Sequence, residues 1–235
     1  YILADMVTEK LKREIGMVVK PLPEEIRILE GEDPSGRARF ENALYQAEKL
    51  KKITISKHSH GESGAGTVVM IVGNDEYDLP FMLADIAFDF GKTGKIFTEF
   101  EAMPLVKDEE STRKYVEPFQ EWREAIGKLP AEPLTGFGEV GEFLKSNVSP
   151  TEYLRFVPDD YIDAVLNFAQ QFFDIFLDIY RKAEPVKDAQ RRRKMDAFRL
   201  EWNKYALDED PSGVMITEAF GRQTAELFYD YLVNL

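Results

Sequence analysis

Between residues 158 and 182, apolar side chains recur every three or four positions, which is the spacing of one face of an α-helix. The stripe consists of Ile162, Val165, Leu166, Ala169, Phe172, Phe173, Phe176 and Ile179. Its rings could line a cofactor pocket, but packing against a core is the favoured interpretation. The same reasoning predicts helices over residues 4–15, 109–126, 187–205 and 215–235, with interruptions at Pro118 and Gly221.

The first half of the chain has a β-type pattern. Residues 67–72 form an apolar, β-branched run that is typical of a central strand. Further strands are predicted over residues 26–30, 37–57, 81–90 and 95–100, whereas residues 128–150, rich in Gly and Pro, are predicted to be a loop. Consecutive strands with short turns pair in antiparallel fashion. The sequence therefore predicts an α+β fold, with one domain over residues 1–235.

Composition narrows the possible functions. The chain has 235 residues, and the 44% that are hydrophobic are enough for a sizeable core. The absence of cysteine excludes disulfides, Cys-ligated metals and thiolate catalysis, and with only 2 His no metal site is expected. The net charge of −13 argues against nucleic acid as a partner. No apolar run has the length of a membrane span, and no signal peptide is visible.

Two glycine-rich segments resemble nucleotide-binding loops only superficially. Residues 136–141 match G-x-G-x-x-G, a motif that requires a strand directly before it. Residues 130–135 read as a loop instead, so a dinucleotide site is not expected. Residues 61–66 lack the Lys-Ser/Thr of a P-loop and are predicted to be a hairpin turn.

Three polar residues in or just after the predicted strands could carry chemistry. His58 and His60 would share one face of a strand and could hold a metal ion, but no third ligand is near, so a surface pair is favoured. Asp85 lies within the apolar residues 81–88. A carboxyl group buried there would suit a proton donor, because burial disfavours its charged form. Strand alternation equally allows Asp85 to face solvent, so both interpretations stay open.

Several stretches, taken in order, resemble the ferredoxin-dependent bilin reductases from about residue 25 to the end. The combination of Leu79-Pro80 with Asp85 five residues after the proline, Asp210-Pro211 and Phe220-Gly221 carries most of the resemblance. The other matching stretches are residues 42–46, 50–53, 67–70, 89–92, 114–118, 153–156 and 193–205.

The resemblance implies a three-layer α/β/α sandwich with a central antiparallel sheet. It implies that biliverdin binds between the sheet and the C-terminal helices, with no bound metal or flavin and with ferredoxin as the external donor of single electrons. Asp85 matches the family's central proton-donating aspartate, and Asp210 matches a second acid of the phycoerythrobilin- and phytochromobilin-forming branches. Arg155 matches a basic residue that pairs with a bilin propionate, a role that suits a guanidinium group.

The chain departs from the phycocyanobilin-forming branch at two positions. The places of that branch's His and Glu are taken by Val68 (or Thr67, one residue away) and by Ser56, and these residues, with Met70, are expected to contact the substrate. The loss argues against phycocyanobilin-type chemistry and leaves an arrangement of two aspartates. The expected product is of the 15,16-dihydrobiliverdin or phycoerythrobilin type. The aromatic face of the helix over residues 158–182 is expected to desolvate both acids.

A basic block on this acidic chain is the candidate ferredoxin-docking surface. It consists of Arg191, Arg192, Arg193 and Lys194, supported by Arg199, Lys49, Lys51 and Lys52. Such a run is more often an ordinary solvated face, so both interpretations stand.

Three rival functions remain beside a biliverdin reductase: a reductase of a chlorophyll catabolite, a non-catalytic bilin-binding protein, and an α+β domain with another ligand. We expect a monomer in the cytoplasm, or in the plastid stroma if a transit peptide has been removed.

Overall fold

The computed structural model describes residues 1–33, 36–61, 64–88, 93–134 and 140–235. Its centre is a nine-stranded sheet in which every paired strand is antiparallel to its neighbour. The strands are β1 (Val18–Val19), β2 (Ile28–Asp33), β3 (Gly36–Ala47), β4 (Leu50–His60), β5 (Gly64–Gly73), β6 (Phe81–Phe88), β7 (Lys95–Met103), β8 (Glu132–Pro133) and β9 (Tyr153–Pro158). They run in the order β1-β3-β4-β5-β6-β7-β9-β8, and β2 also pairs with β3.

The register of the central strands places five residues in one row across the sheet. Asn42 lies opposite Ser56, Ser56 opposite Val68, Val68 opposite Asp85, and Asp85 opposite Glu99. Directly opposed residues of antiparallel strands project from the same face. Asp85 and Glu99 therefore share one side of the sheet as neighbours.

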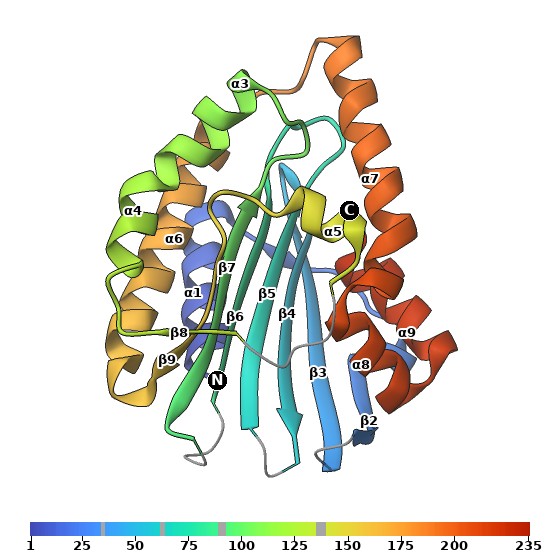
Figure 1. Cartoon of the computed structure of the whole chain (residues 1–235). Helices are drawn as coiled ribbons and strands as arrows, with labels where there is room; N and C mark the ends of the chain where they lie inside the picture. Colours follow the sequence, from blue (N-terminus) through green and yellow to red (C-terminus); the bar gives the residue numbers. More distant parts are fainter. Residues whose placement is uncertain (34–35, 62–63, 89–92, 135–139) are drawn as a thin grey trace.

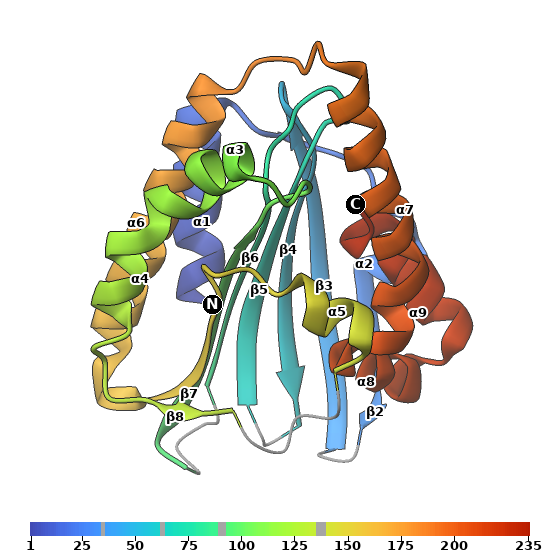
Figure 2. The same cartoon turned by 45° about the horizontal axis from the view of Figure 1, so that its top comes forward.

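Helices cover both faces of the sheet, so the predicted three-layer sandwich is confirmed (Figures 1 and 2). The helices are α1 (Ile2–Ile15), α2 (Glu24–Arg27), α3 (Glu109–Ser111), α4 (Gln120–Ile126), α5 (Glu142–Asn147), α6 (Ile162–Lys182), α7 (Ala189–Glu209), α8 (Pro211–Phe220) and α9 (Arg222–Phe228). One face, called the packed face below, lies under α1, α4 and α6. The other, called the cavity face, lies under α7, α8 and α9.

The packed face holds a dense aromatic cluster. Phe172 of α6 contacts the rings of Phe100, Phe119 and Trp122, with centroid separations of 5.2, 5.2 and 5.0 Å. The stripe of α6 is thus core, as favoured from the sequence. The expectation that this aromatic face desolvates both acids is wrong, because α6 lies on the opposite side of the sheet from Asp85 and Asp210.

A short connection between α7 and α8 positions the second candidate acid. Asp210 caps α8, and its Oδ1 accepts a hydrogen bond from the backbone N–H of Ser212 at 2.8 Å. Pro211 follows as the first helical residue, where its missing N–H costs nothing. The gap between the helices predicted over residues 187–205 and 215–235 is therefore a change of direction between two helices.

Other sequence predictions fare unevenly. The segment around Pro118 does interrupt its helix, since a π-helical turn (Thr112–Val116) and a 3-10 turn (Glu117–Phe119) precede α4. The loop predicted over residues 128–150 contains β8 and α5, and β9 was not among the predicted strands.

Most of the G-x-G-x-x-G motif lies outside the described residues. Within the described part of the chain, no helix combines the length and apolar character of a membrane span.

Candidate active site

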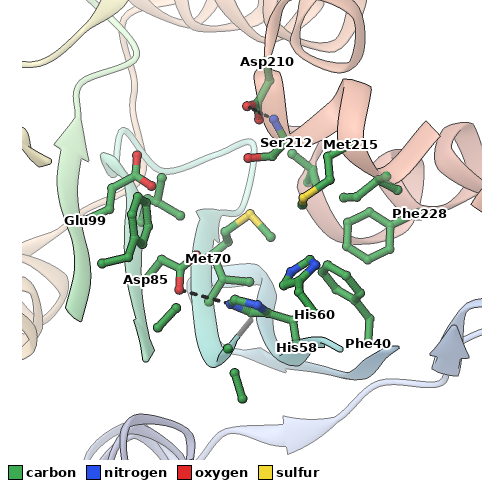
Figure 3. Close-up of a pocket in the computed structure, with 18 of the residues that line it drawn as sticks. Phe40, His58, His60, Met70, Asp85, Glu99, Asp210, Ser212, Met215 and Phe228 are labelled. Atoms are coloured by element: carbon green, nitrogen blue, oxygen red, sulfur yellow. Dashed lines mark hydrogen bonds and ion pairs between the residues drawn. The ribbon is translucent and has the colours of Figure 1, made fainter. Parts of the chain in front are cut away.

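A cavity of about 520 Å³ lies between the cavity face of the sheet and helices α7 to α9 (Figure 3). Its size falls in the usual range for small-molecule and cofactor sites. Most of its lining is apolar, including Phe40, Met70, Leu83, Trp202, Met215 and Phe228. A few titratable groups converge on it, namely His58, His60, Asp85, Lys95, Glu99, Asp210 and Tyr229.

Asp85 projects from β6 into this cavity and is partly buried, so it lies between the two interpretations that the sequence left open. Its Oδ1 lies 3.3 Å from Nε2 of His58, and the two side chains are 17% and 10% exposed. The ring of Phe40 stacks on His58 at a centroid distance of 5.6 Å. His58 is therefore a buried residue that contacts Asp85, and its interpretation as a surface residue is wrong.

Glycine at position 66 makes this contact possible. His58 belongs to β4 and Asp85 to β6, so the imidazole must reach across β5. Gly66 of β5 lies directly opposite His58. A Cβ at Gly66 would stand 2.7 Å from Nε2 of His58 and 2.5 Å from Cβ of Ala87. The missing side chain thus leaves the space that the imidazole ring occupies.

Glu99 lies beside Asp85 on β7 and also lines the cavity. Burial away from bulk solvent raises the pKa of Glu99 well above its ordinary value, and the nearby carboxyl groups of Asp85, Glu101 and Asp210 raise it further. The neutral form of the Glu99 carboxyl group is therefore favoured more than in an exposed glutamate. Glu99 is a partly buried acid of the cavity that the sequence analysis did not single out.

Asp210 stands on the opposite wall of the cavity, on the helical side. Burial raises its pKa, although hydrogen bonds from Ser212 and from the hydroxyl group of Tyr229 act in the other direction. The Tyr229 hydroxyl donates to Oδ2 at 3.1 Å. The cavity therefore has one candidate acid on the sheet and another on the helices.

The structure brings together four of the predicted site residues: Asp85, Val68, Met70 and Asp210 all line the cavity. Ser56 lies in the same cross-strand row but is fully buried, and its Oγ has no hydrogen-bond partner in the described part of the chain.

Thr67 and Arg155 do not reach the cavity, so their predicted roles as substrate contacts are corrected. Thr67 alternates with Val68 and lines a separate hollow on the packed face. Arg155 alternates with Phe156, which does line the cavity, and therefore points to the packed face as well. Its guanidinium group donates to the backbone carbonyl of Leu154 at 2.7 Å.

In the predicted docking block, one side chain is mostly buried and three are exposed. Arg191 is mostly buried and forms ion pairs with Asp78, Asp108 and Glu110 at 2.5, 3.1 and 3.3 Å. Its charge is used inside the protein, so its assignment to a docking surface is corrected. Arg192, Arg193 and Lys194 are exposed.

The other cations assigned to the docking surface also bind groups within the protein. The ammonium group of Lys49 donates to the carbonyl oxygens of Tyr180 and Ala183 at 3.0 and 2.7 Å. Lys52 donates to two carbonyls near the C-terminus, and burial lowers its pKa to about 8. Arg199 is 5% exposed. Lys49 thus ties the end of α6 to the sheet, and Lys52 ties the C-terminal segment to it.

The sequence analysis missed Glu99 and misread His58 and His60 for the same reason. Alternation does place His58 and His60 on one face, as predicted, but it does not say which face is covered. Glu99 differs from Asp85 in lying within a mixed polar and apolar strand, so it gave no signal of burial. Within the described ranges, no group of three or more His, Asp or Glu side chains forms a metal site.

An antiparallel sheet between two helical layers, with an acid-lined apolar cavity under the C-terminal helices, defines an α/β/α sandwich with a small-molecule site. The family model for ferredoxin-dependent bilin reductases matches residues 4–233. The chain belongs to this family and is accordingly an oxidoreductase, with ferredoxin as its external electron donor.

Individual relatives are distant. The chain is 25% identical over 192 residues to 15,16-dihydrobiliverdin:ferredoxin oxidoreductase of Gloeobacter violaceus, covering 80% of this chain and 75% of that protein. It is 23% identical over 235 residues to phycoerythrobilin:ferredoxin oxidoreductase of Synechococcus, covering 94% and 88%. The crystal structure of tomato phytochromobilin synthase in complex with biliverdin shares the fold, with a TM-score of 0.77, 15% identity, and coverage of 96% of this chain and 79% of that one.

Proposed function

We propose that this protein reduces biliverdin IXα, or a closely related open-chain tetrapyrrole, with electrons from ferredoxin. The expected product is of the 15,16-dihydrobiliverdin or phycoerythrobilin type. The observation that carries the proposal is the position of Asp85 and Asp210 on opposite walls of one apolar cavity. The names of the relatives support the substrate class.

The chemistry needs acids at more than one place around the substrate. Reduction of one double bond consumes two electrons and two protons, and ferredoxin delivers the electrons one at a time. The singly reduced tetrapyrrole is a stronger base than the starting pigment, so a positioned acid can protonate it before the second electron arrives. Acids on two walls allow different regions of the pigment to be protonated.

Each proposed acid has its own partners. Asp210 is partly buried, and burial raises its pKa, which favours the neutral form. Asp85 contacts His58, so an imidazole adjoins the proposed donor on the sheet. The position that carries a His in the phycocyanobilin-forming branch is assigned to Val68 or Thr67 here, but His58 brings an imidazole to Asp85 from another strand.

The apolar lining would serve the reaction by excluding water. Phe40, Met215 and Phe228 belong to the apolar lining of the cavity that holds the two acids. A dry surrounding strengthens the electrostatic influence of each acid on the pigment and protects a radical from side reactions.

For ferredoxin docking we propose the exposed remainder of the basic block, Arg192, Arg193 and Lys194. Attraction between opposite charges on the two proteins raises the rate at which they associate and makes this rate depend on salt concentration. Reversing the charge of Arg193 and Lys194 should therefore lower turnover at low ferredoxin concentration and leave biliverdin binding unchanged. Unchanged turnover across ionic strengths would contradict this assignment.

The proposed function is tested by absorbance under anaerobic conditions. Biliverdin IXα is added to the purified protein, followed by ferredoxin, a ferredoxin reductase and NADPH. We expect a shifted spectrum of bound pigment that evolves to a product absorbing at shorter wavelength. A shifted spectrum that never evolves would instead support a bilin-binding protein. No shift with biliverdin would contradict the proposed substrate, and a chlorophyll catabolite would be tried next.

A further inference from the structure

Tyr229 lines the cavity together with Asp210 and forms a hydrogen bond to it. We propose that Tyr229 is a positioning residue for Asp210: its hydroxyl group holds the carboxyl group in place and stabilises the carboxylate that forms when Asp210 gives its proton to the substrate. This inference rests on the proposed function, because it concerns the acid on the helical wall of the same site. Tyr229 acts through Asp210 and not on the pigment itself.

Both oxygens of the Asp210 carboxyl group accept a hydrogen bond. Oδ1 accepts the backbone N–H of Ser212 at 2.8 Å, at the start of α8. Oδ2 accepts the hydroxyl group of Tyr229 at 3.1 Å. The first turn of a helix carries a partial positive charge, so the start of α8 acts in the same direction as the two donors. Positive partial charges therefore surround the group on which negative charge develops when the proton leaves.

The segment that carries Tyr229 is tied to the sheet. Tyr229 is 2% exposed and begins a π-helical turn (Tyr229–Val233) that follows α9. The carbonyl group of Leu232 in this turn accepts the hydroxyl group of Thr54 on β4 at 2.8 Å. Lys52, on the same strand, donates to two further carbonyls of the C-terminal segment at 2.9 and 2.6 Å. These contacts hold the tyrosine hydroxyl group in place, as a positioning group requires.

Glycine at position 213 leaves room for this hydroxyl group. Gly213 lies in the first turn of α8, three residues after Asp210. A Cβ atom there would stand 2.8 Å from Oη of Tyr229 and would overlap the carbonyl oxygen of Leu207. A larger residue would therefore displace the hydroxyl group or the end of α7. The missing side chain allows Tyr229 to reach Asp210.

The hydrogen bond from Tyr229 favours release of the proton. The proton passes from the Asp210 carboxyl group to the singly reduced tetrapyrrole, and the carboxylate keeps the electron pair of the broken O–H bond. A donor at Oδ2 stabilises this carboxylate more than it stabilises the neutral acid. Burial raises the pKa of Asp210, whereas the hydrogen bonds from Ser212 and Tyr229 lower it. Burial therefore helps the acid to hold its proton, and the two donors help it to release the proton.

The charged groups around this pair come from several elements. Glu99 lines the cavity from β7, and the carboxyl group of Asp210 raises its pKa. Glu209 precedes Asp210 and accepts two N–H groups of α5. Asp208 pairs with Arg222 of α9. The remaining titratable groups of the cavity are His58, His60, Asp85 and Lys95. Removing the tyrosine hydroxyl group keeps all of these side chains, so a changed pH profile can be assigned to the lost hydrogen bond.

Tyr153 provides a matched control on the packed face. It is also 2% exposed, and it belongs to the core on that side of the sheet. Its hydroxyl group has no hydrogen-bond partner in the described part of the chain. Tyr153→Phe therefore removes a buried hydroxyl group far from the proposed chemistry, whereas Tyr229→Phe removes the one that holds Asp210.

The test compares Tyr229→Phe, Tyr153→Phe, Asp210→Asn and the double variant Tyr229→Phe/Asp210→Asn in anaerobic reduction of biliverdin IXα by reduced ferredoxin. Tyr229→Phe should slow the step that fails in Asp210→Asn by about tenfold, the lower end of what a hydrogen bond to a charged group contributes. In the double variant Tyr229→Phe should add no further loss, because the tyrosine acts through Asp210. Biliverdin affinity should change little, and Tyr153→Phe should behave like the unsubstituted protein.

The pH dependence gives a readout that a merely structural role would not move. Tyr229→Phe removes one hydrogen bond that lowers the pKa of Asp210, so this pKa should rise. The rate of the Asp210-dependent step falls as the acid loses its proton, and this fall should move to higher pH in Tyr229→Phe but not in Tyr153→Phe. Infrared titration of the carboxylic C=O band that is missing in Asp210→Asn measures the same shift without turnover.

A shifted titration, together with no added loss in the double variant, supports the hydroxyl group as the positioning donor of Asp210. An unshifted titration in Tyr229→Phe, or a further loss of rate when Tyr229→Phe is added to Asp210→Asn, would overturn the inference while the proposed function stands. Failure of the unsubstituted protein to reduce biliverdin would overturn both, whatever the infrared titration shows.

Discussion

The two faces of the sheet use the same strands for different purposes. On the packed face, large aromatic side chains such as Phe100, Trp122 and Phe172 fill the space between sheet and helices. On the cavity face, the alternate positions of the same strands carry Asp85 and Glu99 and leave a hollow. Strand alternation thus separates stability from chemistry within single strands. Substitutions on the packed face should therefore lower stability more than activity, and substitutions on the cavity face should lower activity more than stability.

The largest effect on stability is expected at Phe172. Phe172→Ala would leave a void among Phe100, Phe119 and Trp122, and such truncations cost about 3–5 kcal/mol of unfolding free energy. Met215→Ala, on the cavity face, should cost only about 1 kcal/mol, because its side chain already borders open space. Urea unfolding of both variants measures the difference. Equal losses would mean that the two faces are not distinct in packing.

Arg191 connects α7 with the segments before β6 and α3, and its removal should lower stability nearly as much as the truncation of Phe172. It lies on α7 and pairs with the buried Asp78, which precedes β6, and with Asp108, which precedes α3. Arg191→Ala would leave the Asp78 carboxylate without its cation in a buried site, at a cost of about 3 kcal/mol. Arg193→Ala, on the exposed side of the same helix, should change stability by less than about 0.5 kcal/mol. Similar losses in thermal unfolding of the two variants would contradict the buried role of Arg191.

A buried acid should make stability fall as pH rises. Glu101 has a pKa of about 7 in the folded protein, against 4.5 ordinarily, so the folded state binds the extra proton between these values. Its contribution to stability is complete below pH 4.5 and is lost as pH rises through 7, by up to roughly 3 kcal/mol. Glu101→Gln should flatten the profile of unfolding free energy between pH 5 and about 7. An unchanged slope would show that other groups govern this range.

The smallest effect predicted is at Gly66, and it should fall on activity. Gly66→Ala places a methyl group where the His58 ring lies, so the imidazole must move away from Asp85. We expect reduction to slow by about tenfold, within the range of a displaced acid–base partner. Gly73→Ala, on the same strand but outside the cavity, is the control. Full activity of Gly66→Ala would mean that the His58–Asp85 contact is dispensable.

The sequence predicted the main helices and strands because they depend on local patterns, whereas the three-layer arrangement was implied by the resemblance to the family. Periodicity located α6, and β-branched runs located β5, without knowledge of tertiary contacts. The strand β9 was missed because Tyr153–Pro158 is short and mixed in character. Its partner β7 precedes it by some fifty residues, so nothing local announces the pairing.

The site was predictable only in part. Asp85 stood out as a lone acid in an apolar strand, and the resemblance to the family pointed to Asp210. Arg155 was assigned by motif alone, and strand alternation turns it to the packed face. His58 and Glu99 join the site through register between strands, which a single sequence does not specify.

The most direct test of the account is reduction of bound biliverdin IXα by Asp85→Asn. Asparagine keeps the size of the side chain and removes its acid. The account predicts a normal shift of the pigment spectrum on binding, followed by reduction at least about 100-fold slower than in the unsubstituted protein under anaerobic conditions with ferredoxin. Reduction of biliverdin by Asp85→Asn at the unsubstituted rate would contradict the assignment of this carboxyl group as the proton donor on the sheet.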